Sequence, residues 1–304
     1  MTETLSLAST VRLSSGHLMP LLGLGVYQNN DCSAACLAAL KHGYRHIDSA
    51  RMYKNEAQVG KAVRDSGIPR EEIFVTSKIF PSEHGYDSTF KAVDSSLERF
   101  GFDYLDLFLI HAPLSGKEKR LETWRALVDC KKAGKLRTIG VSNYGVRHLE
   151  EIHEAGLETP SVNQIELHPF CQQQAIVNYC DKHNIFVQAY CPLIRGKFSN
   201  PVFQEVAKKY NKSVAQVLVR WSLQRGFSPL PKSSRPERVV SNADVYGFAL
   251  ADDDMARINT LDRGKDGAIS WNPVEVDGYF GVVTGVVGKW VENTVGAVLG
   301  PFRR

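Results

Sequence analysis

The sequence predicts an α/β protein in which eight strand–helix units alternate and close a parallel barrel. Stretches rich in Leu, Ile, Val and Phe alternate with stretches of helical periodicity, and the connections are short. Eight such units are the number that closes a barrel. An open doubly wound sheet would need a glycine-rich phosphate loop after its first strand, where this chain has Ser49, Ala50, Arg51 and Met52. The closed barrel is therefore the predicted fold.

A β-hairpin is expected before the barrel. Two short apolar stretches flank Ser15 and Gly16 within residues 11–20, which is a hairpin pattern. The following Gly23-Leu24-Gly25 is not a dinucleotide fingerprint, because Gln28 stands where the third glycine would fall. We interpret this stretch as a tight turn near a ligand.

The barrel elements then follow in order. Strands are expected at residues 44–48, 73–78, 104–111, 137–142, 162–166, 185–190 and 227–231, with a weak eighth strand at residues 245–248. Helices are expected at residues 31–42, 55–66, 88–100, 121–133, 146–154, 173–183, 214–224 and 236–242. A longer excursion, residues 191–211, carries a helix of its own. We expect one domain, residues 1–304, with its core at about residues 11–263 and a tail at residues 264–304.

Composition excludes several classes of function. The hydrophobic content of 43% and charged content of 23% are those of an ordinary soluble globular protein. The net charge of +4 comes from scattered Lys and Arg, so no nucleic-acid partner is expected. The six cysteines have no disulfide-framework spacing, and residues 1–12 lack the pattern of a signal peptide, so none is expected. A cytoplasmic protein with free thiols follows. Cys32 and Cys36 fit a packed helix face better than a metal site, and no metal is expected.

Polar side chains stand at the ends of three consecutive expected strands. They are Asp48, Lys78 and His111, and Tyr53 follows Asp48 in the loop that leaves the first strand. Each alone has an ordinary explanation as a helix cap, a solvated charge or a packed imidazole. At the carboxyl ends of parallel barrel strands, however, they would converge on one rim, which is where such barrels carry their chemistry.

These four side chains suit the protonation of an oxygen that becomes an alkoxide. A tyrosine with a pKa of about 10 is a poor acid at neutral pH. We expect the Lys78 ammonium to lower the pKa of Tyr53 and Asp48 to hold that ammonium in place. His111 can donate a hydrogen bond to a carbonyl oxygen beside Tyr53. The set contains no nucleophile and no metal shell, so a nicotinamide is the natural source of electrons.

Six stretches give the chain a resemblance to the aldo-keto reductase superfamily, extending from about Leu13 to Arg263. They are Gly-Tyr-Arg-His-Ile-Asp-Ser-Ala-Arg-Met-Tyr-Lys-Asn-Glu (residues 43–56), Ile-Phe-Val-Thr-Ser-Lys (73–78), Gly-Tyr-Asp (85–87), Tyr-Leu-Asp-Leu-Phe-Leu-Ile-His (104–111), Ile-Gly-Val-Ser-Asn (139–143) and Leu-Pro-Lys-Ser (230–233). The resemblance implies a (β/α)8 TIM barrel, a catalytic tetrad of Asp48, Tyr53, Lys78 and His111, and Tyr53 as the general acid. The activity implied is reduction of an aldehyde or ketone to the alcohol.

The resemblance also implies a set of cofactor contacts. Ser142, Asn143 and Gln164 match the residues that hold the carboxamide, Tyr190 matches the ring that stacks on the nicotinamide, and Pro192 and Leu193 match the loop over the pyrophosphate, where Cys191 replaces the usual serine. Lys232, Ser233, Ser234 and Arg238 match the clamp on the 2′-phosphate, and Asn242 matches an adenine contact, with Ser241 where many members have a glutamate. Gly25, Val26, Tyr27 and Asp48 complete the set.

Charge at the clamp favours NADPH over NADH. Lys232 ends the seventh expected strand, and Arg238 lies about one turn into the next helix. Two cations that converge there suit a phosphate monoester. The alternative is that both are solvated surface charges. NADPH and NADP+ are therefore the expected cofactor pair.

The expected substrate is a small-molecule carbonyl compound. Tyr27 stands where a tryptophan is common in the family, and Ala112 stands where an aromatic is often found. The loops after the third and sixth expected strands are short, and in this they resemble the compact microbial and fungal members of the family. Together these features suggest a shallow, open pocket. We expect Tyr27 and Phe80 on its walls, beside Tyr53 and His111.

Two other functions and the role of the tail are left open. Lys78 could form a Schiff base, as in an aldolase, although Asp48 would keep it protonated. The chain could also be a cofactor-binding regulatory barrel with little turnover. Residues 277–304 carry apolar residues near helical spacing. We expect them to pack on the barrel, with a membrane contact or a dimer arm as alternatives, in a monomer or weak dimer.

Overall fold

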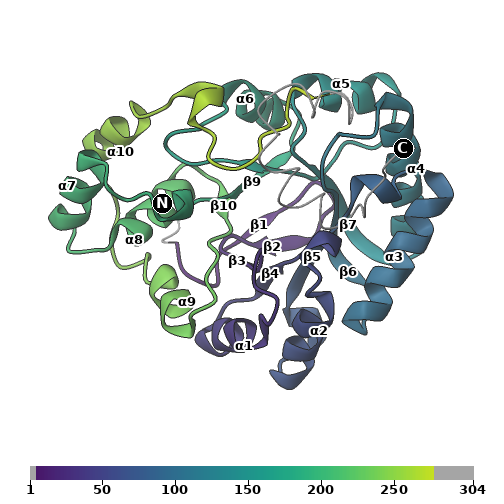
Figure 1. Cartoon of the computed structure of the whole chain (residues 1–304), viewed down its shortest axis with the longest axis horizontal. Helices are drawn as coiled ribbons and strands as arrows, with labels where there is room; N and C mark the ends of the chain where they lie inside the picture. Colours follow the sequence, from purple (N-terminus) through teal and green to yellow (C-terminus); the bar gives the residue numbers. More distant parts are fainter. Residues whose placement is uncertain (1–4, 277–304) are drawn as a thin grey trace, which may run out of the picture.

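In the computed structural model, which describes residues 5–276, eight parallel strands form one sheet that helices surround (Figure 1). The strands run through the sheet in chain order: β3 (Leu24–Gly25), β4 (His46–Asp48), β5 (Phe74–Ile79), β6 (Leu105–Ile110), β7 (Leu136–Ser142), β8 (Val162–Glu166), β9 (Phe186–Tyr190) and β10 (Ser228–Pro229). Every neighbouring pair is parallel. The predicted alternation of strands and helices is confirmed.

The first and last strands close the sheet into a barrel. The Gly23 amide donates to the Pro229 carbonyl at 3.2 Å, and the Gly25 amide donates to the Pro231 carbonyl at 3.1 Å. Gly25 also forms a parallel bridge with Lys232. A Cβ atom on Gly25 would lie 3.0 Å from the Leu230 carbonyl oxygen. Glycine therefore allows the two edge strands to approach closely.

The eighth strand is not where the sequence pattern placed it. Residues 245–248 follow α9 as irregular backbone, and β3 (Leu24–Gly25) supplies the missing strand. The sequence pattern predicts a turn at Gly23-Leu24-Gly25, because the two-residue strand Leu24–Gly25 is too short to show a period-two signal. The barrel therefore begins one strand earlier than predicted, and the strand that ends at Asp48 is its second.

Helices pack around the outside of the barrel in sequence order, and α9 packs back against α1. They are α1 (Ser33–His42), α2 (Glu56–Asp65), α3 (Tyr86–Phe100), α4 (Lys117–Lys132), α5 (Val146–Glu154), α6 (Gln174–Lys182), α8 (Val214–Gln224) and α9 (Pro236–Ala243). Two more helices, α7 (Pro201–Lys209) and α10 (Asp252–Asn259), lie outside the repeating pattern, and α10 was not predicted.

Local sequence explains where individual helices begin and end. Ser213 Oγ accepts a hydrogen bond from the Gln216 amide, and Gln216 Oε1 accepts one from the Ser213 amide. This capping box starts α8. Gly43 takes a left-handed φ of 110° and ends α1, as its sequence position predicted.

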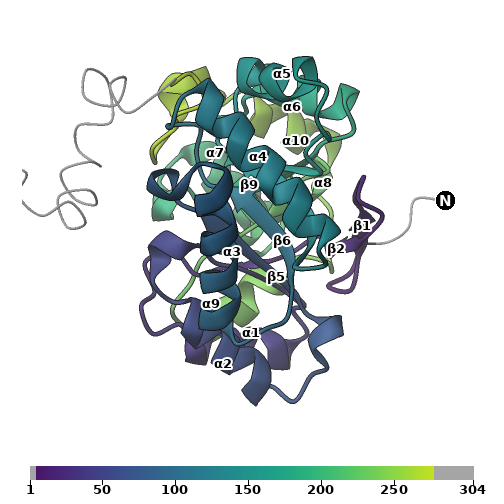
Figure 2. The same cartoon turned by 90° about the vertical axis from the view of Figure 1, so that its right-hand side faces the viewer.

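The predicted hairpin covers the amino-terminal end of the barrel. Strand β1 (Thr10–Arg12) pairs antiparallel with β2 (Leu18–Pro20), and Leu13 and Met19 join a small apolar cluster with Phe74 of β5 and Leu107 of β6. The opposite, carboxyl-terminal end carries the segment that follows α10. Figure 2 shows the hairpin and this yellow segment at opposite ends of the barrel. The functional rim is therefore the end away from the hairpin.

The expectations for residues 277–304, packing on the barrel, membrane contact or a dimer arm, fall outside the described residues. None of the helices between residues 5 and 276 combines the length and the apolar content that crossing a bilayer requires.

Candidate active site

A cavity of about 300 Å³ lies at the carboxyl-terminal rim of the barrel. It brings together most of the side chains that the sequence singled out. Those that line it are Gly25, Tyr27, Asp48, Tyr53, His111, Ser142, Asn143, Gln164, Tyr190, Pro192, Leu193 and Lys232. Residues from seven of the strands and the loops after them thus meet in one place.

A buried ion pair lies beneath the cavity. The Lys78 side chain is fully buried and its Nζ donates to Asp48 Oδ1 at 2.6 Å, to the Ser49 carbonyl at 2.8 Å and to the Tyr53 hydroxyl at 3.4 Å. An ammonium has three donors, and each finds an acceptor. Asp48 Oδ2 accepts from Gln164 Nε2 at 2.8 Å. Lys78 is not among the residues that line the cavity, so its amine lies behind Tyr53.

Tyr53 ends a single turn of 3₁₀-helix, Arg51–Tyr53, that follows β4. Its ring lies between Tyr27, with centroids 5.0 Å apart, and His111, with centroids 5.8 Å apart and the rings edge to face. Lys78 Nζ is 4.9 Å from the centroid of the Tyr53 ring. The phenol is therefore held on three sides, and Tyr53 both lines the cavity and contacts the buried ammonium through its hydroxyl.

The direction of the Tyr53 pKa shift is opposite to the one expected from Lys78. Burial raises the pKa of Tyr53 well above its usual value, and the Asp48 carboxylate raises it further. The physical reason is that Asp48, 2.6 Å from Lys78 Nζ, offsets the positive charge while burial penalises a phenolate. Tyr53 therefore stays protonated at neutral pH in this site.

The pKa values of the neighbouring His111 and Lys78 are lowered. Burial lowers the pKa of His111 well below its usual value, and the nearby Lys78 and His84 lower it further. His111 is therefore a neutral imidazole with one N–H to donate. Burial also lowers the pKa of Lys78, although Asp48 opposes this shift.

The residues matched to the nicotinamide contacts form one hydrogen-bonded unit with the tetrad. Asn143, with a left-handed φ of 62°, donates from Nδ2 to the His111 carbonyl at 2.9 Å and accepts from the Tyr190 hydroxyl at 2.7 Å. Ser142 Oγ donates to the Gln164 carbonyl at 2.8 Å. Strands β7, β8 and β9 thereby fix these side chains relative to one another and to His111.

A group of exposed cations lies next to the cavity, where β10 leads into α9. Lys232, Arg235 and Arg238 are exposed, and none of the three makes an ion pair within residues 5–276. Arg235 was missed by the sequence analysis, although it lies three residues before Arg238 in the same loop and helix start. Unpaired cations at a helix amino terminus suit a phosphate group.

The other residues matched to the cofactor lie beyond the cavity lining. Ser233, Ser234, Arg238, Ser241 and Asn242 follow Lys232 in the loop and in α9. Val26 is buried, and its amide donates to the Asp48 carbonyl at 3.1 Å. These positions continue from the cavity towards α9, as an extended dinucleotide would require.

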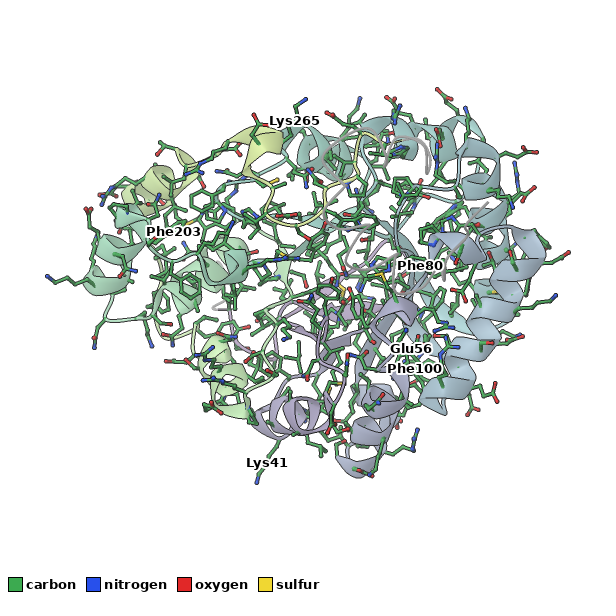
Figure 3. All side chains as sticks on the ribbon, viewed as in Figure 1. Lys41, Glu56, Phe80, Phe100, Phe203 and Lys265 are labelled. Carbon is green, nitrogen blue, oxygen red and sulfur yellow. The ribbon has the colours of Figure 1, made fainter. Side chains whose placement is uncertain are left out.

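The residues that line the cavity differ in part from those expected on its wall. Phe80 does not line the cavity; it is half-buried at the end of β5, just before the 3₁₀ turn Pro81–Glu83 (Figure 3). The lining residues that the sequence analysis did not single out are Gln28, Met52, Cys191, Arg195, Leu230, Ser270 and Trp271. Trp271 packs against Ala112 and Leu114, at the place where the sequence had suggested an open pocket. Its only sequence signal is an isolated aromatic in a polar segment.

Within residues 5–276, no group of three His, Cys, Asp or Glu side chains is placed to hold a metal ion. Fold and site together define a parallel barrel enzyme that does acid–base chemistry on an oxygen atom. A buried phenol with a neutral imidazole beside it suits the role of the acid, and nothing in the set supplies electrons.

Comparison with known proteins gives the family. The model of the aldo/keto reductase family matches residues 21–263, and the chain belongs to this family. The family and the barrel fold predicted from the sequence are thus confirmed.

Relatives of known name are similar over nearly their whole length. The glyoxal reductase of Bacillus subtilis is 46% identical over 275 residues, which cover 89% of this chain and 98% of the relative. An aldo-keto reductase from a Medee basin deep-sea metagenome library has a crystal structure with a TM-score of 0.84 and 42% identity, covering 88% of this chain and 100% of that one. A mutant of Gox0644 in complex with NADPH has a TM-score of 0.82 and 42% identity, covering 88% and 98%.

Proposed function

We propose that this protein is an NADP-dependent oxidoreductase that reduces a small aldehyde or ketone to the alcohol with NADPH. The observation that carries the proposal is Tyr53, which lines the cavity and whose hydroxyl lies 3.4 Å from the buried Lys78 ammonium. A similar protein is named a glyoxal reductase, and another was crystallised with NADPH. Both descriptions agree with this chemistry.

The residues present fit the cofactor. Ser142, Asn143 and Gln164 would hold the carboxamide, and the Tyr190 ring would stack on the nicotinamide. The unpaired cations Lys232, Arg235 and Arg238 would hold the 2′-phosphate. Gly25, Val26, Tyr27, Pro192 and Leu193 would border the bound dinucleotide, and Ser233, Ser234, Ser241 and Asn242 would contact its adenosine end. When bound, the cofactor supplies the two electrons and the hydrogen that reach the carbonyl carbon.

The protein's own residues supply the proton. Tyr53 donates its hydroxyl proton to the carbonyl oxygen as the oxygen becomes an alkoxide, and the alcohol forms. The phenolate left behind faces the Lys78 ammonium, which Asp48 holds in place. His111, kept neutral by burial, donates a hydrogen bond to the same oxygen. The raised pKa of Tyr53 ensures that the proton is present before the reaction begins.

The test is the replacement Tyr53→Phe, which removes the hydroxyl and keeps the ring. We expect NADPH oxidation with aldehydes to fall by at least about a hundredfold, the usual size of a lost general acid. Binding of NADPH, measured by quenching of tryptophan fluorescence, should change little. Retained turnover would refute Tyr53 as the acid.

A Schiff-base aldolase is a weaker candidate. The Lys78 side chain is fully buried, and its Nζ donates hydrogen bonds to three protein acceptors. Lys78 does not line the cavity. A regulatory barrel that binds cofactor without turnover would need a defective acid, and the tetrad is complete. Trapping with borohydride addresses the first candidate, and turnover with any carbonyl compound addresses the second.

The substrate class we propose is small carbonyl compounds, including dicarbonyls such as glyoxal, since the cavity of about 300 Å³ must also admit the nicotinamide ring. A spectrophotometric screen of aldehydes, ketoacids and dicarbonyls would rank them.

We further propose that the protein is cytoplasmic, because its six cysteines are free. We also propose one domain over residues 1–304 and a monomer or weak dimer. Light scattering would measure the oligomeric state.

A further inference from the structure

Glu166 is a buried carboxylate that the proposed chemistry does not use. It is the last residue of β8 and is fully buried. Its Oε1 accepts hydrogen bonds from the Ile269 amide at 2.6 Å and the Ser270 amide at 3.1 Å, and Oε2 also lies 3.1 Å from the Ser270 amide. His168 Nε2 lies 2.9 Å from Oε1. The carboxylate thus ties β8 to a segment about 100 residues further along the chain.

That segment, residues 268–274, is named here the C-terminal strap. It crosses the functional rim as part of the yellow segment in Figure 1. Beyond Glu166 it has further attachments: the Tyr190 hydroxyl lies 2.9 Å from the Trp271 carbonyl, and the Val274 carbonyl rests on Gly145, where a Cβ atom would be only 2.1 Å away. Trp271 is therefore fixed from both sides along the chain.

The strap carries two side chains into the cavity. Ser270 and Trp271 line it, and Trp271 also packs against Ala112 and Leu114, just after His111. Glu166 is not among the lining residues. Beyond the effect of burial, its charge raises the pKa of Tyr190 and Cys191, which line the cavity, but its hydrogen bonds reach the cavity wall through the strap.

The negative charge of Glu166 determines which groups of the strap can contact it. A buried carboxylate is costly unless hydrogen bonds satisfy it. Within the part of the chain that the structure describes, Glu166 has no Lys or Arg partner. Its carboxylate oxygens form hydrogen bonds with the two strap amides and with His168 instead. Two consecutive amides aimed at one carboxylate fix the orientation of the peptide between them, which a purely apolar contact would not do.

We propose that Glu166 is a positioning residue for carbonyl reduction, and that it sets the substrate wall by fixing the C-terminal strap and, through it, the Trp271 indole. This inference rests on the proposed function. Larger carbonyl compounds reach this wall more than small ones do, so Glu166 governs the preference for substrate size without touching the substrate.

The test is a double-mutant cycle with Glu166→Gln and Trp271→Ala, assayed with benzaldehyde and with glyoxal at saturating NADPH. Gln keeps the shape of the side chain, but one of its two polar atoms becomes a donor facing amide donors. We expect Glu166→Gln to raise KM for benzaldehyde by about tenfold and for glyoxal much less, with kcat little changed. In the Trp271→Ala background it should have no further effect.

The matched control is Glu56→Gln. Glu56 (Figure 3) is likewise a buried carboxylate, but it accepts from Ser77, Ser96 and Arg99, away from the strap. Its replacement should leave the ratio of the two KM values unchanged. Should Glu166→Gln fail to fold, Ser270→Pro removes one strap amide while leaving Glu166 intact, and it should give the same shift in the KM ratio.

A second measurement needs no turnover. Amide hydrogen exchange of residues 268–274 should be faster in Glu166→Gln than in the unmodified protein and unchanged in Glu56→Gln. Additive losses in the cycle, or unchanged exchange in the strap, would overturn the positioning role. An unmodified protein that reduces no carbonyl compound would instead overturn the proposed function, so the two failures can be told apart.

Discussion

Replacement of Asp48 by Asn probes the buried ion pair that supports Tyr53, the proposed acid. The Lys78 and Asp48 side chains are 0% and 5% exposed, and their charged atoms are 2.6 Å apart. At this distance the attraction is about 6 kcal/mol for an effective dielectric constant of about 20. Asp48 Oδ2 also accepts from Gln164, so an Asn side chain must turn its amide nitrogen towards either Lys78 or Gln164, both of which are donors.

The expected loss in the free energy of unfolding at pH 7 is about 3–5 kcal/mol, the usual cost of leaving one partner of a buried pair uncompensated. Burial already lowers the pKa of Lys78, and Asp48 opposes that shift, so Asp48→Asn should lower it further. A lysine with a folded-state pKa below its unfolded value destabilises the protein below that folded pKa. The penalty fades as the pH rises towards about 10.4.

Urea denaturation at pH 7 and pH 9.5 measures this loss and its dependence on pH. The deficit of Asp48→Asn should shrink at the higher pH, and the double variant Asp48→Asn/Lys78→Met should be more stable than Asp48→Asn alone, because it no longer buries an unpaired ammonium. A deficit below about 1 kcal/mol, or an equal deficit at both pH values, would refute this account of the pair.

Other perturbations test the cation group and the buried histidines. Arg238→Ala should raise KM for NADPH by about tenfold or more and leave KM for NADH nearly unchanged, because only NADPH carries the 2′-phosphate; equal changes for both cofactors would argue against the clamp. Burial lowers the pKa of His46 to about 4 and that of His84 to about 3. Both folded pKa values lie below the unfolded value, so the stability they contribute is complete above about pH 6.5 and is lost as the pH falls, by about 1.4 kcal/mol per pH unit for each histidine. Chemical denaturation between pH 6.5 and pH 5 should show this slope, and His84→Gln should reduce it; a flat profile would contradict the assignment.

The parts of the site that could be predicted from sequence are those set by local position. Asp48, Lys78 and His111 each stand at or just beyond the end of an apolar stretch, and parallel strands bring such ends to one rim. Tyr53 follows from its short distance along the chain to Asp48. The strand and helix order follows from periodicity, which is also a local property.

The parts that could not be predicted depend on contacts made only in the folded chain. Strand β3 has two residues and no period, so it is visible only through its pairing with β4 and its closure against β10. Trp271 reaches the cavity because Glu166 and Tyr190 hold the strap. The upward shift of the Tyr53 pKa depends on burial, which no spacing of residues reveals.

The closure of the barrel between Gly25 and Lys232 has a consequence for synthesis of the protein. The seam joins an early part of the nascent polypeptide to a late one, so most of the chain must be synthesised before the cavity at the rim can form. Until then, two strand edges stay unpaired and open to association with other chains. Fragments that stop short of β10 should therefore aggregate rather than yield a weakened enzyme.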